Sequence, residues 1–150
     1  MNSITISKAK VSDAQIIRKL EEKIWSQEVV NKYDAPMFVR FGYVYIAKHE
    51  KKIIGALIAY QTKDNEVYVC DWITDKKYRS KKIGKKLYER LIEEVGEKPI
   101  VSFIDPKNTP SLRAHLKLGF KVIKKIKNPY ALNEGYRVFV KRNSNKNIQK

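Results

Sequence analysis

The sequence predicts a single α+β domain in which a mixed, largely antiparallel twisted sheet is flanked by helices. Three observations indicate this class. The chain has 150 residues, enough for one domain with a buried core. Apolar residues alternate with period two in several short stretches and recur with helical spacing in others. The resulting order of strands and helices is typical of one layered sheet and contains no domain linker.

The first part of the chain predicts one strand and one helix, at residues 3–7 and 13–25. Ser12 and Gln15 have the spacing of a capping box, and an apolar stripe follows them at helical intervals. Pro36 interrupts any long helix in the next segment. We therefore expect a loop there with at most one short helix.

Three β-rich runs come next. The polar Glu50–Lys51 turn separates the first two, which predict an antiparallel hairpin. A second polar turn, at residues 63–65, leads into the third run. These strands are expected at residues 43–49, 52–62 and 66–74.

The period of the apolar residues changes from two to 3.6 across residues 75–82, so a strand-to-helix turn is expected there. Gly96 and Pro99 end the helix that follows. Thr109 has the features of an N-cap with proline next to it, and Gly119 those of a C-terminal cap, which brackets a short helix. The remaining strands are expected at residues 99–104, 121–126 and 136–141.

Composition restricts the function further. The formal net charge of +16 predicts attraction to polyanions, which include nucleic acids and phosphate-rich cofactors. The single cysteine, Cys70, forms no internal disulfide, is expected to be a buried or half-buried strand residue, and with two scattered histidines provides no metal site. No apolar run approaches the roughly 20 residues that span a bilayer, and the N-terminus lacks the apolar centre of a secretory signal.

From these features we expect a soluble cytoplasmic protein that binds no membrane and no metal. Residues 1–142 are expected to form the domain, and the basic tail at residues 143–150 to be frayed because it has nothing to bury. Whether the chain forms a homodimer stays open, since neither sheet edge can be judged from one sequence.

The stretch KYRSKKIGKKL, residues 77–87, is the candidate ligand site. Its basic side chains surround Gly84 without an acidic residue, between a strand and the start of a helix. Unpaired amides and the helix dipole favour phosphate at such a turn, and glycine lets a backbone approach a ligand closely. Lysines at a helix N-terminus oppose its dipole, which is unfavourable without a bound anion. A phosphate-binding turn is therefore favoured over a merely solvated helix face.

This turn, together with three other segments in the same order, resembles the GNAT superfamily of acetyl-CoA-dependent N-acyltransferases. The other segments are ITISKAKVSDAQIIRKLEE at the start, EKKIIGALIAY in the hairpin and NTPSLRAHLKLGF near the C-terminus. The resemblance covers residues 4–126 and extends to the last strand.

The resemblance implies that acetyl-CoA is the co-substrate and that Arg79, Ser80, Lys81, Lys82, Ile83, Gly84 and Lys85 hold its pyrophosphate, mainly through backbone amides. It also implies that the main chain of Trp72 and Thr74, at the splayed end of the preceding strand, pairs with pantetheine and polarises the thioester carbonyl. Asn108 matches a position that commonly contacts pantetheine. Tyr130 lies in a loop where family members line the acceptor site with aromatic residues; core packing is the alternative.

Two residues depart from the family pattern. Lys82 stands where the turn has its first glycine, and a lysine does not adopt positive φ without a conformational penalty. His115 stands where the family has a tyrosine that protonates the departing thiolate. We hypothesise that His115 tunes thiolate departure, with packing on its helix face as the alternative.

An amine attacks a thioester directly only when it is unprotonated, so the site needs a base or a water path. Asp71 is the first candidate for this base and Glu66 the second, because both lie on the strand that leads to the thioester. The alternative for Asp71 is binding a substrate amine or a neighbouring backbone group, and for Glu66 it is plain solvent exposure.

The sequence thus predicts an N-acetyltransferase that acts on a primary amine of a small molecule, peptide or protein. The alternative is a catalytically degenerate basic module of the same fold that binds nucleic acid or another polyanion through non-specific charge. Acetyl-CoA binding separates the two hypotheses.

Overall fold

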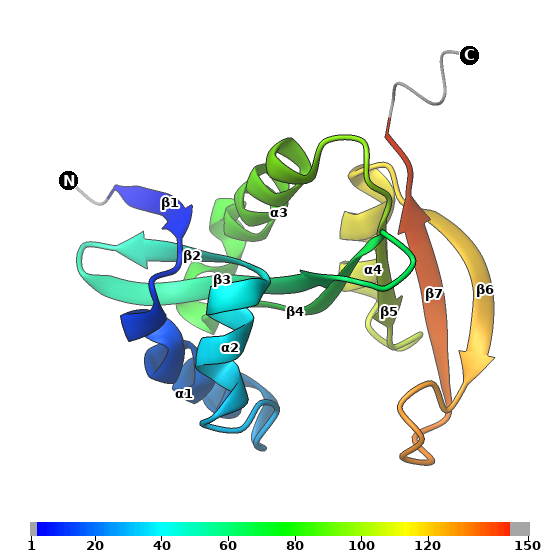
Figure 1. Cartoon of the computed structure of the whole chain (residues 1–150), viewed down its shortest axis with the longest axis horizontal. Helices are drawn as coiled ribbons and strands as arrows, with labels where there is room; N and C mark the ends of the chain where they lie inside the picture. Colours follow the sequence, from blue (N-terminus) through cyan, green and yellow to red (C-terminus); the bar gives the residue numbers. More distant parts are fainter. Residues whose placement is uncertain (1–2, 145–150) are drawn as a thin grey trace. The chain divides into compact units, whose positions relative to one another are not determined.

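The structure is a computed structural model, and it describes residues 3–144. Those residues form a seven-stranded mixed sheet with strand order β1-β2-β3-β4-β5-β7-β6, flanked by four α-helices (Figure 1). The expected α+β class is confirmed. Most of the predicted tail, residues 145–150, lies outside the described residues. Within residues 3–144, no helix combines the length and the apolar character that a membrane span requires.

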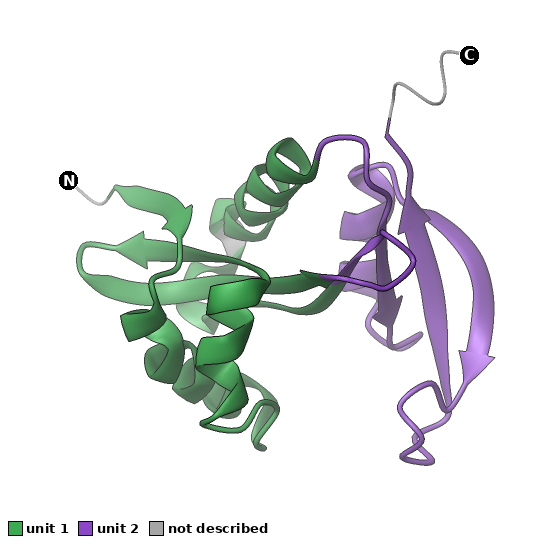
Figure 2. Ribbon diagram, in the orientation of Figure 1, with its two compact units in different colours: residues 1–60, 69–95 green, residues 61–68, 96–150 purple. Residues whose placement is uncertain are grey.

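Two compact units make up the chain (Figure 2). Unit 1 comprises residues 1–60 and 69–95, and unit 2 comprises residues 61–68 and 96–150. The elements of unit 1 are β1 (Ile4–Lys8), a 3-10 helix (Val11–Asp13), α1 (Ala14–Trp25), α2 (Asp34–Phe41), β2 (Tyr43–His49), β3 (Lys52–Gln61), most of β4 (Val67–Thr74), a second 3-10 helix (Lys76–Lys81) and α3 (Ile83–Val95).

β3 is the central strand of unit 1, and its residues 53–59 are all buried. β2 pairs with it antiparallel, as the hairpin prediction required. On one face of these strands α1 contributes Ile17 and Leu20 to a buried apolar cluster. α3 covers the opposite face (Figure 1). Burial of each such side chain contributes roughly 1.5–3 kcal/mol, which stabilises the packing of the helices on the sheet.

Unit 2 contains β5 (Ile100–Ile104), α4 (Thr109–Lys117), β6 (Lys121–Lys127) and β7 (Tyr136–Arg142). β7 pairs antiparallel with both β5 and β6. The first two residues of β4 also belong to this unit and pair parallel with β5. The strand and helix assignments of this half agree with the sequence prediction to within one or two residues.

Two helix starts differ from the prediction. The Ser12–Gln15 capping box is absent from the described chain: the backbone N–H of Lys10 instead donates to Asp13 Oδ2 at 2.8 Å. The segment that follows α1 contains a loop and one short helix, α2, as expected; Pro36 lies in the first turn of α2, where no intrahelical N–H bond is lost. The N-cap of α4 is Asn108, one residue before the predicted Thr109.

Candidate functional site

Asp75 organises the turn between β4 and α3. Its N–H donates to the carbonyl of Ile54 at 2.7 Å. Its Oδ1 accepts from the backbone N–H of Lys77 at 3.1 Å, and Oδ2 lies 3.3 Å from Lys23 Nζ on α1. The Lys77 N–H, aided by the Lys23 ammonium, lowers the pKa of Asp75 despite its burial. A fixed carboxylate therefore starts the second 3-10 helix and ties the turn to α1.

Lys82 joins that 3-10 helix to α3 in a left-handed conformation, with φ 59° and ψ 26°. The lysine thus adopts the glycine-like conformation for which the sequence analysis expected a conformational penalty. The strain is about 1 kcal/mol for a residue with a Cβ. A left-handed residue after right-handed ones gathers successive N–H groups into a concavity that binds anions.

The start of α3 adds further donors. The N–H of Lys86 donates to the carbonyl of Lys82 at 3.2 Å. The amides of residues 83–85 come earlier in the helix and therefore have no carbonyl acceptor within α3. The first turn carries no acidic residue. Seven exposed basic side chains surround this positive helix end: Lys76, Lys77, Arg79, Lys81, Lys82, Lys85 and Lys86. Such an arrangement of amides and charges is suited to an anion. Residues 76–86 are called the anion-binding turn from here on.

Gly84 makes room for a protein side chain. A Cβ at this position would lie 2.8 Å from Cζ2 of the Trp72 indole. The indole Nε1 donates to the Gly84 carbonyl at 3.0 Å, and its ring meets Tyr88 edge to face, with 4.7 Å between the ring centres. The predicted reason for this glycine was close approach of a ligand. The structure supplies a different reason, the packing of β4 on α3.

Two main-chain groups that the resemblance assigns to pantetheine already have protein partners. The Trp72 N–H donates to Asp71 Oδ1 at 3.0 Å. The Thr74 carbonyl accepts from Arg79 Nε at 3.3 Å. A ligand that pairs with these groups has to exchange with the bonds described.

Asp71 is the candidate base, and it is 8% exposed. Besides the Trp72 N–H, its Oδ1 accepts from the indole Nε1 of Trp25 at 3.2 Å. Its Oδ2 is buried and receives no N–H or O–H donor from residues 3–144. The bond from the Trp72 N–H matches the alternative function that the sequence analysis gave for Asp71, binding a neighbouring backbone group instead of acting as a base.

Glu21, on α1, is a site residue that sequence reasoning missed. It is 1% exposed and hydrogen-bonds to the Asp71 side chain. Burial, with the Asp71 carboxyl beside it, raises the pKa of Glu21 to about 10. The signal was present in the sequence, because Glu21 follows Ile17 by four residues and so falls inside the apolar stripe of its helix, where an unpaired carboxylate is rarely buried.

Cys70 is half-buried on β4, as expected, and donates to the carbonyl of Ile58 at 3.4 Å. Burial, with Asp71 and Glu21 nearby, raises the pKa of its thiol to about 12. The group is therefore protonated at neutral pH and is a poor nucleophile.

In unit 2, Glu66 immediately precedes β4. Its Oε2 lies 2.7 Å from Lys141 Nζ on β7, and its side chain is 24% exposed. Glu66 therefore ties the strand start to β7.

His115 is 2% exposed within α4. Its Nδ1 lies 2.8 Å from the Ser111 carbonyl, and its ring meets Phe120 edge to face at 5.0 Å. Burial lowers the pKa of His115 to about 4. At neutral pH the imidazole is uncharged, and the Nδ1–H donates to the carbonyl. This environment favours the packing interpretation over an acid that protonates the thiolate.

Asn108 and Tyr130 are also in unit 2. The Asn108 side-chain oxygen caps α4 by accepting from the Ser111 N–H at 3.2 Å. Tyr130 is 41% exposed in the loop between β6 and β7, with the Arg137 guanidinium 5.5 Å from its ring centre. Partial burial raises the pKa of its hydroxyl.

The structure thus places the predicted residues in two groups. Unit 1 brings together the anion-binding turn, the Trp72 and Thr74 backbone, and Asp71, to which it adds Glu21 and Trp25. Unit 2 holds Glu66, Asn108, His115 and Tyr130.

Comparisons with known proteins agree on one class. The model of the acetyltransferase (GNAT) family matches residues 14–120. No curated protein matches the sequence significantly.

Solved structures resemble the chain over nearly its full length. The ribosomal-protein-S18-alanine N-acetyltransferase of Escherichia coli has a TM-score of 0.81 at 18% identity, with 94% of each chain covered. The diaminobutyrate acetyltransferase EctA of Paenibacillus lautus, solved with L-2,4-diaminobutyric acid and coenzyme A, has a TM-score of 0.80 at 17% identity, covering 95% of this chain and 96% of its own. The protein yncA of Salmonella typhimurium, solved with acetyl-CoA, has a TM-score of 0.79 at 17% identity, with 94% of each chain covered. At these identities the likeness shows the fold.

Proposed function

This chain belongs to the acetyltransferase (GNAT) family, and from that premise we propose that it transfers the acetyl group of acetyl-CoA to a primary amine of a small molecule, peptide or protein. The observation that carries the proposal is the anion-binding turn. Its left-handed Lys82, the amides that open α3 and the exposed basic side chains suit a ligand with several phosphates.

The residues present fit acetyl-CoA, which supplies an activated acetyl thioester when bound. The amides of residues 79–84 would hold its pyrophosphate, and Lys85 would lie beside them. Main-chain groups of Trp72 and Thr74 would orient the remainder after exchanging their present partners, Asp71 and Arg79. In this proposal the cofactor is recognised through backbone groups, so a lysine at residue 82 is compatible with binding.

The acceptor must lose a proton before it attacks. Asp71 accepts two N–H bonds at Oδ1 and is hydrogen-bonded to Glu21, so its carboxyl group is already engaged by the protein. Glu66 is likewise engaged, in its ion pair with Lys141. We therefore assign the deprotonation to water, with Asp71 as the fixed negative charge that attracts an ammonium group. A thiol with the usual pKa of about 8.5 leaves without an acid, which is consistent with a neutral His115.

The acceptor class is supported by the two structural neighbours that are named for amine substrates, an alanine and diaminobutyric acid. Both carry primary amino groups. A binding module for nucleic acid, the other hypothesis, has only the net charge in its favour.

Calorimetry with acetyl-CoA at moderate salt tests the cofactor, and a thiol-release screen over amino acids, peptides, polyamines and aminoglycosides tests the transfer. We expect one-site binding of acetyl-CoA and thiol release with at least one amine class. Failure to bind acetyl-CoA, with retained binding of a DNA or RNA oligonucleotide, would replace this proposal by the polyanion-binding module.

A further inference from the structure

Three side chains on two elements of unit 1 form a connected polar cluster under β4. Glu21 and Trp25 are four residues apart on α1 and therefore lie on one helix face. Asp71 of β4 hydrogen-bonds to both of them. From here on these residues are called the α1–β4 cluster.

The surroundings of Glu21 are apolar apart from this cluster. It borders an internal cavity of about 10 Å³, which has room for one water molecule at most. The other residues lining that cavity, from α1, the following loop, α2, β2 and β3, are all apolar: Ala14, Ile17, Val30, Ala35, Phe38, Val39, Val44 and Ile58. The titratable groups that face Glu21 are Asp71 and the Cys70 thiol, both on β4.

Two ionised carboxylates cannot account for this geometry. Glu21 Oε2 and Asp71 Oδ2 are both buried, and if neither carboxyl carries a proton, each lacks a partner among the residues that the structure describes. One shared proton removes both deficits, because it lets one carboxyl donate to the other. Asp71 Oδ1 receives two N–H donors, so Asp71 is the ionised member and Glu21 is the donor.

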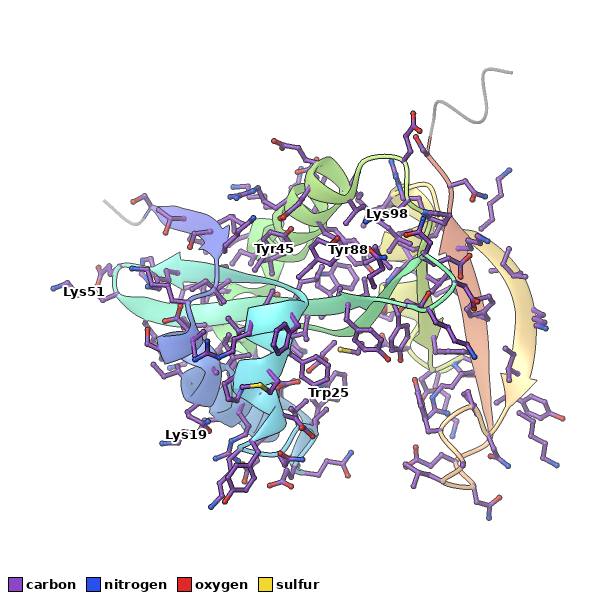
Figure 3. All side chains as sticks on the ribbon, viewed as in Figure 1. Lys19, Trp25, Tyr45, Lys51, Tyr88 and Lys98 are labelled. Carbon is purple, nitrogen blue, oxygen red and sulfur yellow. The ribbon has the colours of Figure 1, made fainter. Side chains whose placement is uncertain are left out.

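The pair also fixes an exposed aromatic ring. Trp25 is the last residue of α1, and Ser26 turns the chain away in a left-handed conformation. The indole N–H is anchored on Asp71, while the ring remains 45% exposed on the face of the sheet opposite Tyr88 (Figure 3). An aromatic face backed by a fixed negative charge attracts a cation.

We infer that Glu21 and Asp71 share a single proton and act as positioning residues that hold Trp25 as the contact for the ammonium form of the acceptor. The acceptor part rests on the proposed acetyl transfer. The shared proton and the anchored indole do not depend on it.

The two tryptophans of the chain allow a direct test by ¹H–¹⁵N NMR, because each contributes one indole signal. W25F assigns them by removing one. We expect D71N to move the Trp25 signal upfield and to leave the Trp72 signal, whose acceptor is the Gly84 carbonyl, in place. E21Q, which keeps a donor, should leave both signals near their positions, whereas E21A should move the Trp25 signal. An unmoved Trp25 signal in D71N, or identical spectra of E21Q and E21A, would overturn the anchoring.

A pH titration of the same indole signals tests whether Glu21 carries the shared proton. In the wild type the Trp25 signal should stay constant from pH 6 to 8 and move on approach to about pH 10, where Glu21 ionises. E21Q should abolish that movement. E22Q, at the exposed neighbouring position, should retain it. Movement of the wild-type signal that persists unchanged in E21Q would refute the shared proton.

The acceptor contact is tested with whichever amine is active in the thiol-release screen. W25L should raise the KM for that amine about 3- to 30-fold, the range of a cation–π contact, and leave the KM for acetyl-CoA unchanged. F41L, at an 82% exposed aromatic of α2, is the matched control and should change neither value. An unchanged amine KM in folded W25L would exclude the contact. If no amine is active, the proposed function and the acceptor contact are both rejected. The NMR spectra still test whether Glu21 and Asp71 share a proton and anchor the Trp25 indole.

Discussion

At residue 82 the backbone has a conformation that glycine adopts freely and lysine adopts with strain. Lys82 is held there because the 3-10 helix before it and α3 after it are both anchored, the first by Asp75 and the second by its buried apolar face. Strain retained by its surroundings is typical of ligand-binding backbones. The sequence identified residue 82 by its place in the turn and indicated that a lysine there is unfavourable for positive φ. It could not show that the flanking elements impose this φ.

We expect K82G to increase the free energy of unfolding by up to about 1 kcal/mol, since it removes the left-handed strain. K82A keeps the Cβ and should not share this gain. Denaturant unfolding of both variants measures the difference. Equal stability of the two would show that the backbone at residue 82 is not strained.

Glu21 makes a second prediction at this scale. The carboxyl keeps its proton in the folded protein up to about pH 10 but loses it near pH 4.5 when unfolded. Its contribution to stability is therefore complete below pH 4.5 and is lost progressively as the pH rises toward 10. E21Q should remove this decline, so that its stability relative to the wild type increases between pH 5 and 9. Thermal unfolding over that range checks this, and E22Q, which should follow the wild type, is the control. A wild-type slope that remains in E21Q would contradict it.

At the scale of elements, the candidate site depends mainly on which helices pack against β4. Its apolar alternation predicted the strand, and the change of period predicted the turn and α3 correctly. Partners across the sheet were not predictable, because a single sequence does not show which helix face meets which strand. Glu21 and Trp25 therefore remained residues of an amphipathic helix until α1 was seen to pack on β4. The same limit applies to Gly84, whose function depends on the Trp72 ring.

G84A should be destabilising even though alanine is the better helix former by about 1 kcal/mol. The added Cβ would meet the Trp72 indole at 2.8 Å, so the ring has to shift and its bond to the residue 84 carbonyl weakens. A displaced Trp72 indole signal with reduced stability is the expected result. A more stable G84A with an unmoved Trp72 signal would show that the indole does not occupy this space.

α4 gives a prediction in acid. The His115 imidazole has a pKa of about 4 when folded and 6.5 when unfolded. Its contribution to stability is present above pH 6.5 and is lost as the pH falls toward 4. H115Q should flatten this acid decline, measured by urea unfolding between pH 4 and 7. R113Q, an exposed substitution in the same helix, should leave it unchanged. An equally steep decline in H115Q would place its origin elsewhere.

At the scale of the whole molecule, the charge of +16 is the most unusual property of the chain. Taken alone it allows any polyanion as ligand. The fold restricts the class of ligand, because it places seven exposed basic side chains around one helix start. Backbone amides there add directional donors for phosphate, which a general positive surface lacks. The family and the fold class followed from the order of motifs in the sequence. The acceptor did not, because its contacts come from side chains whose neighbours only the fold reveals.

The central claim is that the anion-binding turn holds the phosphates of acetyl-CoA. Titration calorimetry of acetyl-CoA into the wild type, K81A/K85A and K51A tests it, at low and at moderate salt. Lys51 lies in the β2–β3 turn and is the control for loss of positive charge (Figure 3). We predict one binding site in all three proteins, with weaker affinity and a reduced dependence on salt only in K81A/K85A. Absence of binding in the wild type, or an equal loss of affinity in K51A and K81A/K85A, would contradict the account.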